Sequence, residues 1–368
     1  MTSVSKSIPL SKISLALDWT PNTNHAGFFV AQSQGLFSDY GLDVSIISTD
    51  DPIYQGSYLS KNEDKKNSEY NTPCGLVAQG LANFAINSPE GAINWNIQSK
   101  TSSLPSLKTV AALTQRNTSA IAARPNILRP RELDGKKYAS YAARFEGRIV
   151  QQLIKNDGGK GEYEEVVQPM LGLWNTVLCD ESEEGATDAT WIFTAWEGVE
   201  AELRNADINL FYLEDYGIPY GYAPCLMANS TFLTQESETC RAFLKASAIG
   251  FQYASNHPQE TAEIFIEDSL VPKDHPIYTK AFLVRSMEIL SRTFLTPEGS
   301  WGSMEKKRWD TYLDWLDENR LLTTYTNSRH PKEGISTSLD KLRSGQGGAR
   351  IPRQEIDSRD IFTNDFLR

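Results

Sequence analysis

The sequence predicts an α/β protein in which strands alternate with helices and form mostly parallel sheets. Three observations carry this prediction. Short apolar segments recur along the chain, helical patterns separate them, and turn-forming residues follow several of these segments. With 368 residues, the chain is also long enough for two domains, each with its own core.

The expected elements follow in order along the chain. Each strand is a short apolar or alternating run, and each helix has apolar positions at helical spacing. Strands are expected at 13–17, 44–48, 84–87, 110–114, 138–141 and 190–193. Helices are expected at 28–35, 75–82, 147–156 and 197–204, and a long core helix at 243–266. Residues 51–70 are rich in Asn, Lys, Asp, Glu and Ser, which predicts a long surface insertion.

Composition and charge narrow the classes of function. The chain is 40% hydrophobic and 23% charged, as is ordinary for a globular protein, and its net charge is −11. A nucleic-acid surface needs clustered Lys and Arg, so this acidic balance argues against one. No apolar run reaches the roughly 18 residues of a membrane span. The first ten residues lack the apolar core of a signal peptide, which favours a cytoplasmic location.

The cysteines do not indicate a metal site. Cys74, Cys179, Cys225 and Cys240 form no CxxC pair, and their spacings match no metal-ligand pattern. We therefore expect free thiols and no bound metal.

The most informative stretch is 17–37, which reads Leu-Asp-Trp-Thr-Pro-Asn-Thr-Asn-His-Ala-Gly-Phe-Phe-Val-Ala-Gln-Ser-Gln-Gly-Leu-Phe. It joins a strand end, a polar turn and a helix, and open α/β sheets bind small ligands at such loops. One large ring beside amides and a carboxylate suits a flat, polar, aromatic ligand. The alternative is that Asn22 or Asn24 simply caps the helix. The candidate ligand-binding residues here are Asp18, Trp19, Asn22, Asn24 and His25.

This stretch closely resembles the start of the thiamine-pyrimidine family. The family includes bacterial proteins that bind thiamine-derived pyrimidines for importers, and thiamine pyrimidine synthases. The resemblance spans nearly the whole chain. It continues at 41–44, 82–86, 133–136, 190–198, 216–219 and 361–367.

The resemblance implies a two-lobed fold of the type II periplasmic-binding-protein kind, with the ligand between the lobes. Lobe one would hold residues 1–115 and 225–330, and lobe two would be inserted at 118–222. Residues 331–360 have linker composition. Residues 361–368 would form a C-terminal segment that docks back on the body.

A second group of candidate residues follows the strand expected at 190–193. The resemblance places Trp196 and Glu197 at the ligand. There the carboxylate would accept hydrogen bonds from the amino group of an aminopyrimidine, or share a proton with a ring nitrogen. The alternative is that Glu197 only complements the helix dipole.

Three further residues complete the candidate ligand-binding set. Glu90 follows the strand expected at 84–87, at another loop that would enter the cleft. Glu146 starts a helix of lobe two, where it either caps the helix or reaches the ligand. Tyr222 lies in the segment 221–226.

The synthase branch differs from this chain at its reactive residues. In that branch, a Lys-x-x-x-His motif supplies the lysine that holds pyridoxal phosphate and the histidine that is consumed, and iron takes part. Alignment on 84–86 puts Asn87 at the lysine and Gly91 at the histidine. Asparagine cannot form a Schiff base, and glycine has no imidazole to donate. The cysteine-rich run of that branch is reduced to Cys225.

Two functions remain open on the sequence alone. One is a non-catalytic binder of a hydroxymethylpyrimidine-type aminopyrimidine, with Trp19 and Trp196 as stacking walls and Asn22, Glu90 and Glu197 at the ligand edge. The other is a diverged enzyme of pyrimidine synthesis that retains pyridoxal phosphate and iron through other residues. The fold family also holds binders of sulfonate and nitrate, so a shifted specificity is a third alternative. No nucleic-acid or membrane partner is expected, and a homodimer is compatible with the two lobes.

Overall fold

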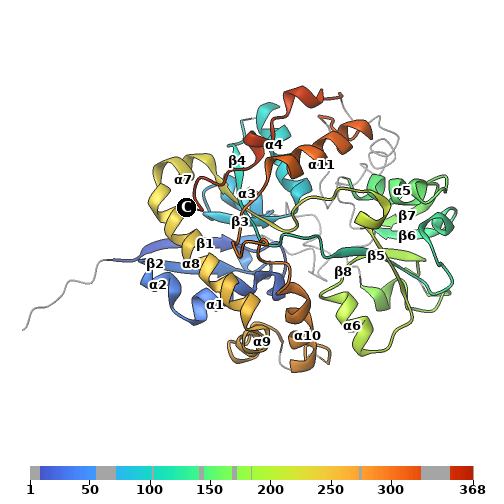
Figure 1. Ribbon diagram of the computed structural model, residues 1–368, viewed down its shortest axis with the longest axis horizontal. Coiled ribbons are helices and arrows are strands. Elements are labelled where there is room, and N and C mark those ends of the chain that lie inside the picture. The colour runs from blue at the N-terminus through green and yellow to red at the C-terminus, as the bar shows by residue number, and fades with distance from the viewer. Residues whose placement is uncertain are drawn as a thin grey trace, which may run out of the picture.

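The protein is described by a computed structural model (Figure 1). The described residues are 9–54, 72–101, 103–140, 145–167, 172–183, 185–272, 276–324 and 349–367. Most of the insertion predicted at 51–70 therefore lies outside them, as does most of the tail predicted at 331–360.

Two five-stranded sheets organise the described residues. Sheet A has the order β2-β1-β3-β10-β4, and sheet B has the order β7-β6-β8-β5-β9. Figure 1 shows sheet B on the right of the view and sheet A to its left. Sheet A contains β1 (Ser11–Ala16), β2 (Leu42–Ile47), β3 (Phe84–Asn87), β4 (Leu107–Ala112) and β10 (Cys225–Asn229). Sheet B contains β5 (Ser119–Ala123), β6 (Lys137–Ser140), β7 (Glu164–Val167), β8 (Ala189–Phe193) and β9 (Asn209–Tyr212).

The directions of the strands follow from the two crossings of the chain between the sheets, at 113–118 and 213–224. In each sheet four of the five strands run the same way, and the reversed ones are β5 and β10. Each reversed strand is the first after a crossing. Because it enters at the edge facing the other sheet, it has to run away from that sheet. The carboxyl ends of the other strands thus point to the region between the sheets, where such folds bind ligands.

Helices cover both sheets and account for the α/β class. On sheet B lie α5 (Glu146–Asn156) and α6 (Glu197–Leu203). The remaining helices are α1 (Ala26–Ser33), α2 (Leu36–Asp39), α3 (Pro73–Ala78), α4 (Pro89–Thr101), α7 (Ser230–Gln235), α8 (Ser237–Asn256), α9 (Pro258–Glu267), α10 (Lys280–Leu290), α11 (Lys306–Glu318) and α13 (Ser358–Ile361). Short 3-10 turns are η1 (Thr23–His25), η2 (Pro52–Tyr54), η4 (Pro130–Leu133), η5 (Leu173–Asn175), η6 (Leu213–Tyr216) and η7 (Arg353–Glu355).

The single long helix expected at 243–266 is wrong, because the chain forms two helices there, α8 and α9. The break falls at His257, whose φ of −128° and ψ of 60° lie outside the helical region. Pro258 follows it, and proline disfavours the helical conformation of the preceding residue. Proline instead suits the first position of α9.

Helices α1 and α8 pack unusually closely in the core of sheet A. A Cβ added to Gly250 would lie 2.0 Å from the carbonyl oxygen of Gly27. Beside this contact, the Phe28 ring meets the Phe251 ring edge-on, with centroids 5.0 Å apart, and Phe251 stacks on Trp301 at 4.6 Å. Only glycine allows the two backbones to approach this far, so the aromatic packing around them depends on it.

The end of the chain lies along β4. The backbone N–H of Thr363 donates to the carbonyl of Thr109 over 2.9 Å. The Asn364 side chain forms two hydrogen bonds with the Met304 backbone, accepting from its N–H at 3.1 Å and donating to its carbonyl at 2.8 Å. The last residues thus join β4 to the segment that precedes α11.

We expect Asn364→Ala to destabilise the protein by about 1–3 kcal/mol, because both Met304 backbone groups lose their partner. Thermal unfolding should show a melting temperature a few degrees below that of the wild type. Asp360→Asn is the matched control in the same segment, since it removes only an exposed ion pair with Lys100. Equal melting temperatures for the two variants would contradict this role of Asn364.

Candidate functional site

The polar turn after β1 is held together by its own side chains. Asn22 caps η1: its Oδ1 accepts from the backbone N–H and the side-chain Nδ2 of Asn24, each at 3.0 Å. Its Nδ2 donates to the carbonyl of Thr20 over 2.9 Å. The His25 ring, only 1% exposed, lies 3.0 Å from a carboxylate oxygen of Asp18. Asn22 therefore caps the turn η1, in line with the alternative that it serves as a helix cap.

The turn also carries a partly exposed carboxylate, a half-buried ring and a buried acceptor. Asp18 is 36% exposed at its side chain, and Trp19 is half-buried. The Oδ1 atom of Asn24 is buried without a hydrogen-bond partner. An unused buried acceptor beside a carboxylate suits a ligand that donates N–H or O–H groups.

The Trp-Glu pair after β8 packs against a helix of the other sheet. The Trp196 ring contacts Tyr278 at 5.1 Å and Phe282, on α10, at 4.8 Å between centroids. Glu197, in the first turn of α6, accepts the backbone N–H of Phe193 over 2.9 Å. Burial is the main reason that the pKa of its carboxyl rises from 4.5 to about 7.

Helix α10 brings the first two groups of candidate residues together. The Ser286 hydroxyl lies 2.6 Å from the hydroxyl of Thr23 in η1, and it also donates to the carbonyl of Ala195. The turn after β1 and the end of β8 therefore meet at one side chain. Farther along α10, Arg285 pairs with Glu202 of α6 at 3.0 Å.

The third group joins the two sheets through Glu90. This residue lies in the first turn of α4 and is 5% exposed. Its Oε2 accepts from the backbone N–H of Phe145, on the sheet B side, at 3.3 Å. Its Oε1 accepts from the hydroxyl of Tyr220, in the second crossing, at 3.0 Å. Nearby Glu146 is 2% exposed and accepts from the Tyr138 hydroxyl over 2.7 Å.

Aromatic rings surround this acidic group. Tyr220 contacts Trp191 of β8 at 5.5 Å and Tyr312 of α11 at 5.6 Å between centroids. Burial, and the nearby charge of Glu90, raise the pKa of both tyrosines well above its ordinary value. The group formed by Glu90, Glu146, Tyr138, Tyr220, Tyr312 and Trp191 is called the interlobe cluster below.

Sequence reasoning found the two glutamates of the interlobe cluster and missed its tyrosines. The glutamates each follow a predicted strand, whereas Tyr220 and Tyr312 lie in a crossing and in a late helix. One available signal is the spacing of Trp309, Tyr312, Leu313 and Leu316, which marks a buried helical face. That spacing indicates burial but not a place at the site.

Tyr222, the last candidate, holds the second crossing to α11. Its hydroxyl accepts the backbone N–H of Glu305 over 2.9 Å, and the Arg308 guanidinium lies 4.1 Å from its ring centre. Arg308 also donates to the carbonyl of Gln115 in the first crossing. Tyr222 and Arg308 therefore fix both crossings at one point.

The resemblance aligns the reactive residues of a synthase with Asn87 and Gly91, which lie against each other in the structure. Asn87 donates to the Cys74 sulfur over 3.0 Å and accepts from the Ser88 N–H over 2.8 Å. A Cβ added to Gly91 would lie 2.2 Å from Oδ1 of Asn87. At these two positions there is no amine for pyridoxal phosphate and no space for an imidazole, so Asn87 and Gly91 do not fit that cofactor. Among the described residues, no group of three His, Cys, Asp or Glu side chains is placed to hold a metal ion.

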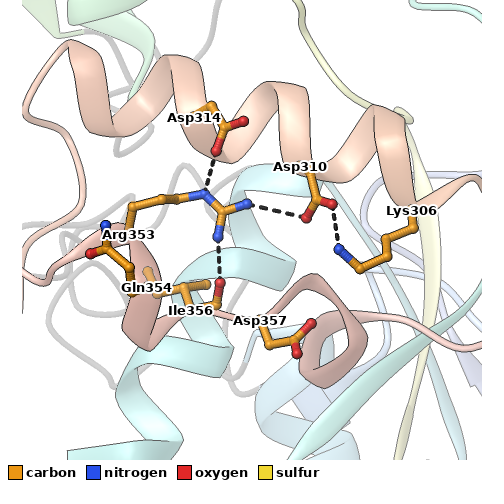
Figure 2. Close-up of a pocket in the computed structure, with 7 residues that line it drawn as sticks. All are labelled: Lys306, Asp310, Asp314, Arg353, Gln354, Ile356 and Asp357. Carbon is orange, nitrogen blue, oxygen red and sulfur yellow. Dashed lines mark hydrogen bonds and ion pairs between the residues drawn. The ribbon is translucent and has the colours of Figure 1, made fainter.

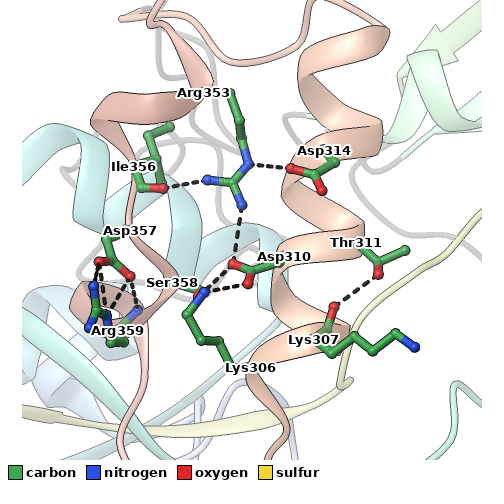
Figure 3. A network of polar contacts seen from close by, with 10 residues as sticks. All are labelled: Lys306, Lys307, Asp310, Thr311, Asp314, Arg353, Ile356, Asp357, Ser358 and Arg359. Atoms are coloured by element: carbon green, nitrogen blue, oxygen red, sulfur yellow. Dashed lines mark hydrogen bonds and ion pairs between the residues drawn. The ribbon is translucent and has the colours of Figure 1, made fainter.

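A cavity of about 290 Å³ lies elsewhere, between α11 and the tail (Figure 2). Arg353 donates to Asp314 over 2.7 Å and to Asp310 over 3.1 Å. Ser358 and Lys306 also bind the Asp310 carboxylate (Figure 3). These charged side chains bind one another, and the contacts attach residues 353–358 to α11. We therefore do not treat the cavity as a candidate ligand site. Its lining residues are Lys306, Asp310, Asp314, Arg353, Gln354, Ile356 and Asp357.

Comparisons with known proteins agree with this architecture. The sequence model of the family described as "NMT1/THI5 like" matches residues 22–65 and 63–261. The formylaminopyrimidine-binding protein of Halalkalibacterium halodurans is 22% identical over 314 residues, covering 85% of this chain and 87% of the relative. The 4-amino-5-hydroxymethyl-2-methylpyrimidine phosphate synthase of Legionella pneumophila is 21% identical, covering 86% and 92%.

Solved structures show the fold. The alkanesulfonate-binding protein SsuA from Xanthomonas axonopodis superposes with a TM-score of 0.57 at 10% identity, covering 88% of this chain and 96% of that one. The expected two-sheet fold of the periplasmic-binding-protein kind is thereby confirmed. No helix in the part of the chain that the structure describes has the length and apolar character needed to cross a membrane.

Proposed function

Since this chain belongs to the NMT1/THI5-like family, we propose that it binds a thiamine-type aminopyrimidine between its two sheets and serves thiamine biosynthesis or salvage. The observation that carries the proposal is Glu90. Its carboxylate contacts Phe145 of the sheet B side and Tyr220 of the second crossing, so it lies where both halves and one crossing meet. Ligands of this fold class bind at the carboxyl ends of the strands.

The chemistry around Glu90 fits an aminopyrimidine. Such a ring presents an amino group, which donates hydrogen bonds, next to a ring nitrogen, which accepts them. Carboxylate and phenol oxygens accept from N–H groups, and flat rings such as Trp191 and Tyr220 pack against a heteroaromatic ring. Asp18 and Glu197 provide further carboxyl groups near the ends of β1 and β8.

We further propose that the two sheets with their helices form lobes that hinge at the crossings 113–118 and 213–224. The Glu90–Phe145 contact closes the lobes over the interlobe cluster. Opening on this side would break the Glu90–Phe145 contact and admit the ligand.

The alternative is a synthase-like enzyme that uses pyridoxal phosphate and iron. The similarity to the Legionella synthase favours it. The packed pair of Asn87 and Gly91 argues against the reaction in which a lysine holds the cofactor and a histidine is consumed. We therefore propose binding rather than synthesis as the activity of this chain.

The test is a titration of the purified protein, followed by tryptophan fluorescence. The ligands are hydroxymethylpyrimidine, its phosphate, formylaminopyrimidine and pyridoxal phosphate. Saturable quenching or enhancement by a pyrimidine, without a response to pyridoxal phosphate, is the expected result. A pyridoxal response that borohydride fixes to a lysine would instead favour the enzyme.

We expect Glu90→Gln to weaken pyrimidine binding at least about tenfold, because a carboxamide offers one acceptor oxygen where the carboxylate offers two. The dissociation constant from the same titration measures this effect. Glu298→Gln, at an exposed turn, is the matched control and should bind like the wild type. Equal dissociation constants for Glu90→Gln and the wild type would remove Glu90 from the site.

A cytoplasmic location and a homodimer remain predictions. Fractionation of cells that produce the full-length protein tests the first. Sedimentation of the purified protein over a range of concentrations tests the second.

A further inference from the structure

The hydroxyl of Tyr312 is a polar group in the interlobe cluster that has no hydrogen-bond partner. Its side chain is fully buried on α11. Its ring meets that of Tyr220 edge-on, and the charge of Glu90 helps to raise its pKa. The hydroxyl therefore keeps its proton at neutral pH, and this proton is available for donation.

A phenylalanine would fill the same space without leaving a buried polar group unsatisfied. Buried hydroxyls nearly always have a partner, and a lone one destabilises the folded protein. A hydroxyl in this position thus indicates a hydrogen-bond partner that is present only when a ligand is bound.

The other polar side chains of the interlobe cluster indicate what that partner is. The Tyr220 hydroxyl already donates its hydrogen to Glu90, and the Tyr138 hydroxyl donates its hydrogen to Glu146. What these four side chains can offer a ligand is therefore oxygen acceptors. The unused hydrogen of Tyr312 is the complementary donor. The cluster thus presents a donor next to acceptors, the reverse of the amino group and adjacent ring nitrogen of an aminopyrimidine.

We propose that Tyr312 donates a hydrogen bond to the ring nitrogen beside the amino group of the ligand, while oxygens of Glu90 and Tyr220 accept from that amino group. This inference rests on the proposed function and adds the orientation of the ligand. The amino edge of the ring points to α4, which carries Glu90, and to α11, which carries Tyr312. Tyr312 is then a specificity-determining residue supplied by the late part of the chain.

The experiment compares two variants that each remove one unpartnered buried hydroxyl. Tyr312→Phe removes it at the interlobe cluster, and Thr261→Val removes it in α9, away from the cluster. Melting temperatures are measured without ligand. Dissociation constants are measured for hydroxymethylpyrimidine and for the analogue that has an oxo group in place of the amino group.

Both variants are expected to melt at or above the temperature of the wild type. For the aminopyrimidine, Tyr312→Phe should raise the dissociation constant about tenfold, and Thr261→Val should leave it unchanged. For the oxo analogue, whose ring nitrogen bears a hydrogen, Tyr312→Phe should change the dissociation constant less than about threefold. The preference for the amino compound over the oxo analogue should therefore be smaller in Tyr312→Phe than in the wild type.

Three results would overturn the inference. If the wild type binds the aminopyrimidine and Tyr312→Phe binds it equally well, the hydroxyl is not a ligand donor, although the proposed function stands. If Tyr312→Phe melts well below Thr261→Val, the hydroxyl has a partner in the empty protein. If the wild type binds neither compound, the proposed function fails and the inference fails with it.

Discussion

Replacement of Gly250 by valine is expected to lower the free energy of unfolding by about 3 kcal/mol or more. Even a methyl group at this position would lie 2.0 Å from the carbonyl oxygen of Gly27, and that oxygen belongs to the backbone of α1. No rotamer change relieves such a clash, so α1 and α8 have to separate. Overpacking of this kind costs about 1–3 kcal/mol or more, a large part of the stability of an ordinary domain.

The measurement is chemical denaturation of the purified variants, with Gly250→Ala as the milder change. Gly198→Ala is the matched control, because a Cβ there would meet its nearest neighbour at an ordinary 3.5 Å. The control should be as stable as the wild type or gain up to about 1 kcal/mol from the better helix propensity of alanine. Stability in Gly250→Ala equal to that of the control would show that the helices can move apart freely.

Lowering the pH from 8 to 5 is expected to stabilise the protein through Glu197. Burial raises the pKa of this carboxyl from 4.5 to about 7 in the folded state. Between these values the folded protein binds more protons than the unfolded chain, so the free energy of unfolding falls as the pH rises. The free-energy cost of ionising Glu197 in the folded protein is absent below about pH 4.5 and complete above about pH 7.

Glu197→Gln should remove this penalty and be more stable than the wild type at pH 8 by about 1–3 kcal/mol. The carboxamide oxygen can still accept the N–H of Phe193. Because other groups also titrate, the informative quantity is the difference in unfolding free energy between variant and wild type at each pH. A difference that stays constant from pH 5 to pH 8 would contradict the raised pKa of Glu197.

Local patterns predicted much of the fold. The strands near 13–17, 84–87 and 190–193 were visible because apolar runs ended in turn residues, as β1, β3 and β8 do. Strand β5 was missed because Ser119–Ala123 consists mostly of small residues and is buried on both faces, with no alternation to mark it. The predicted helix at 243–266 was extended past the end of α8 at Asn256, because the apolar spacing was given more weight than Pro258.

Residues of the candidate site were predictable where they come shortly after a predicted strand in the sequence. Asp18, Glu90 and Glu197 are of this kind. Tyr220 and Tyr312 reach the interlobe cluster because the chain crosses back and α11 packs beside the crossing, which no local pattern encodes. The role of Asn22 in capping depends on the conformation of its turn, and sequence could name that alternative without deciding it.

The docking of 361–367 along β4 has a consequence for biosynthesis. Sheet B is built from one continuous stretch, so it can finish folding while the ribosome is still adding residues. Sheet A has to wait for β10, and its β4 edge is met by residues 362–363, which are made much later. A chain released before residue 361 would therefore hold all five strands of each sheet but leave the β4 edge of sheet A uncovered.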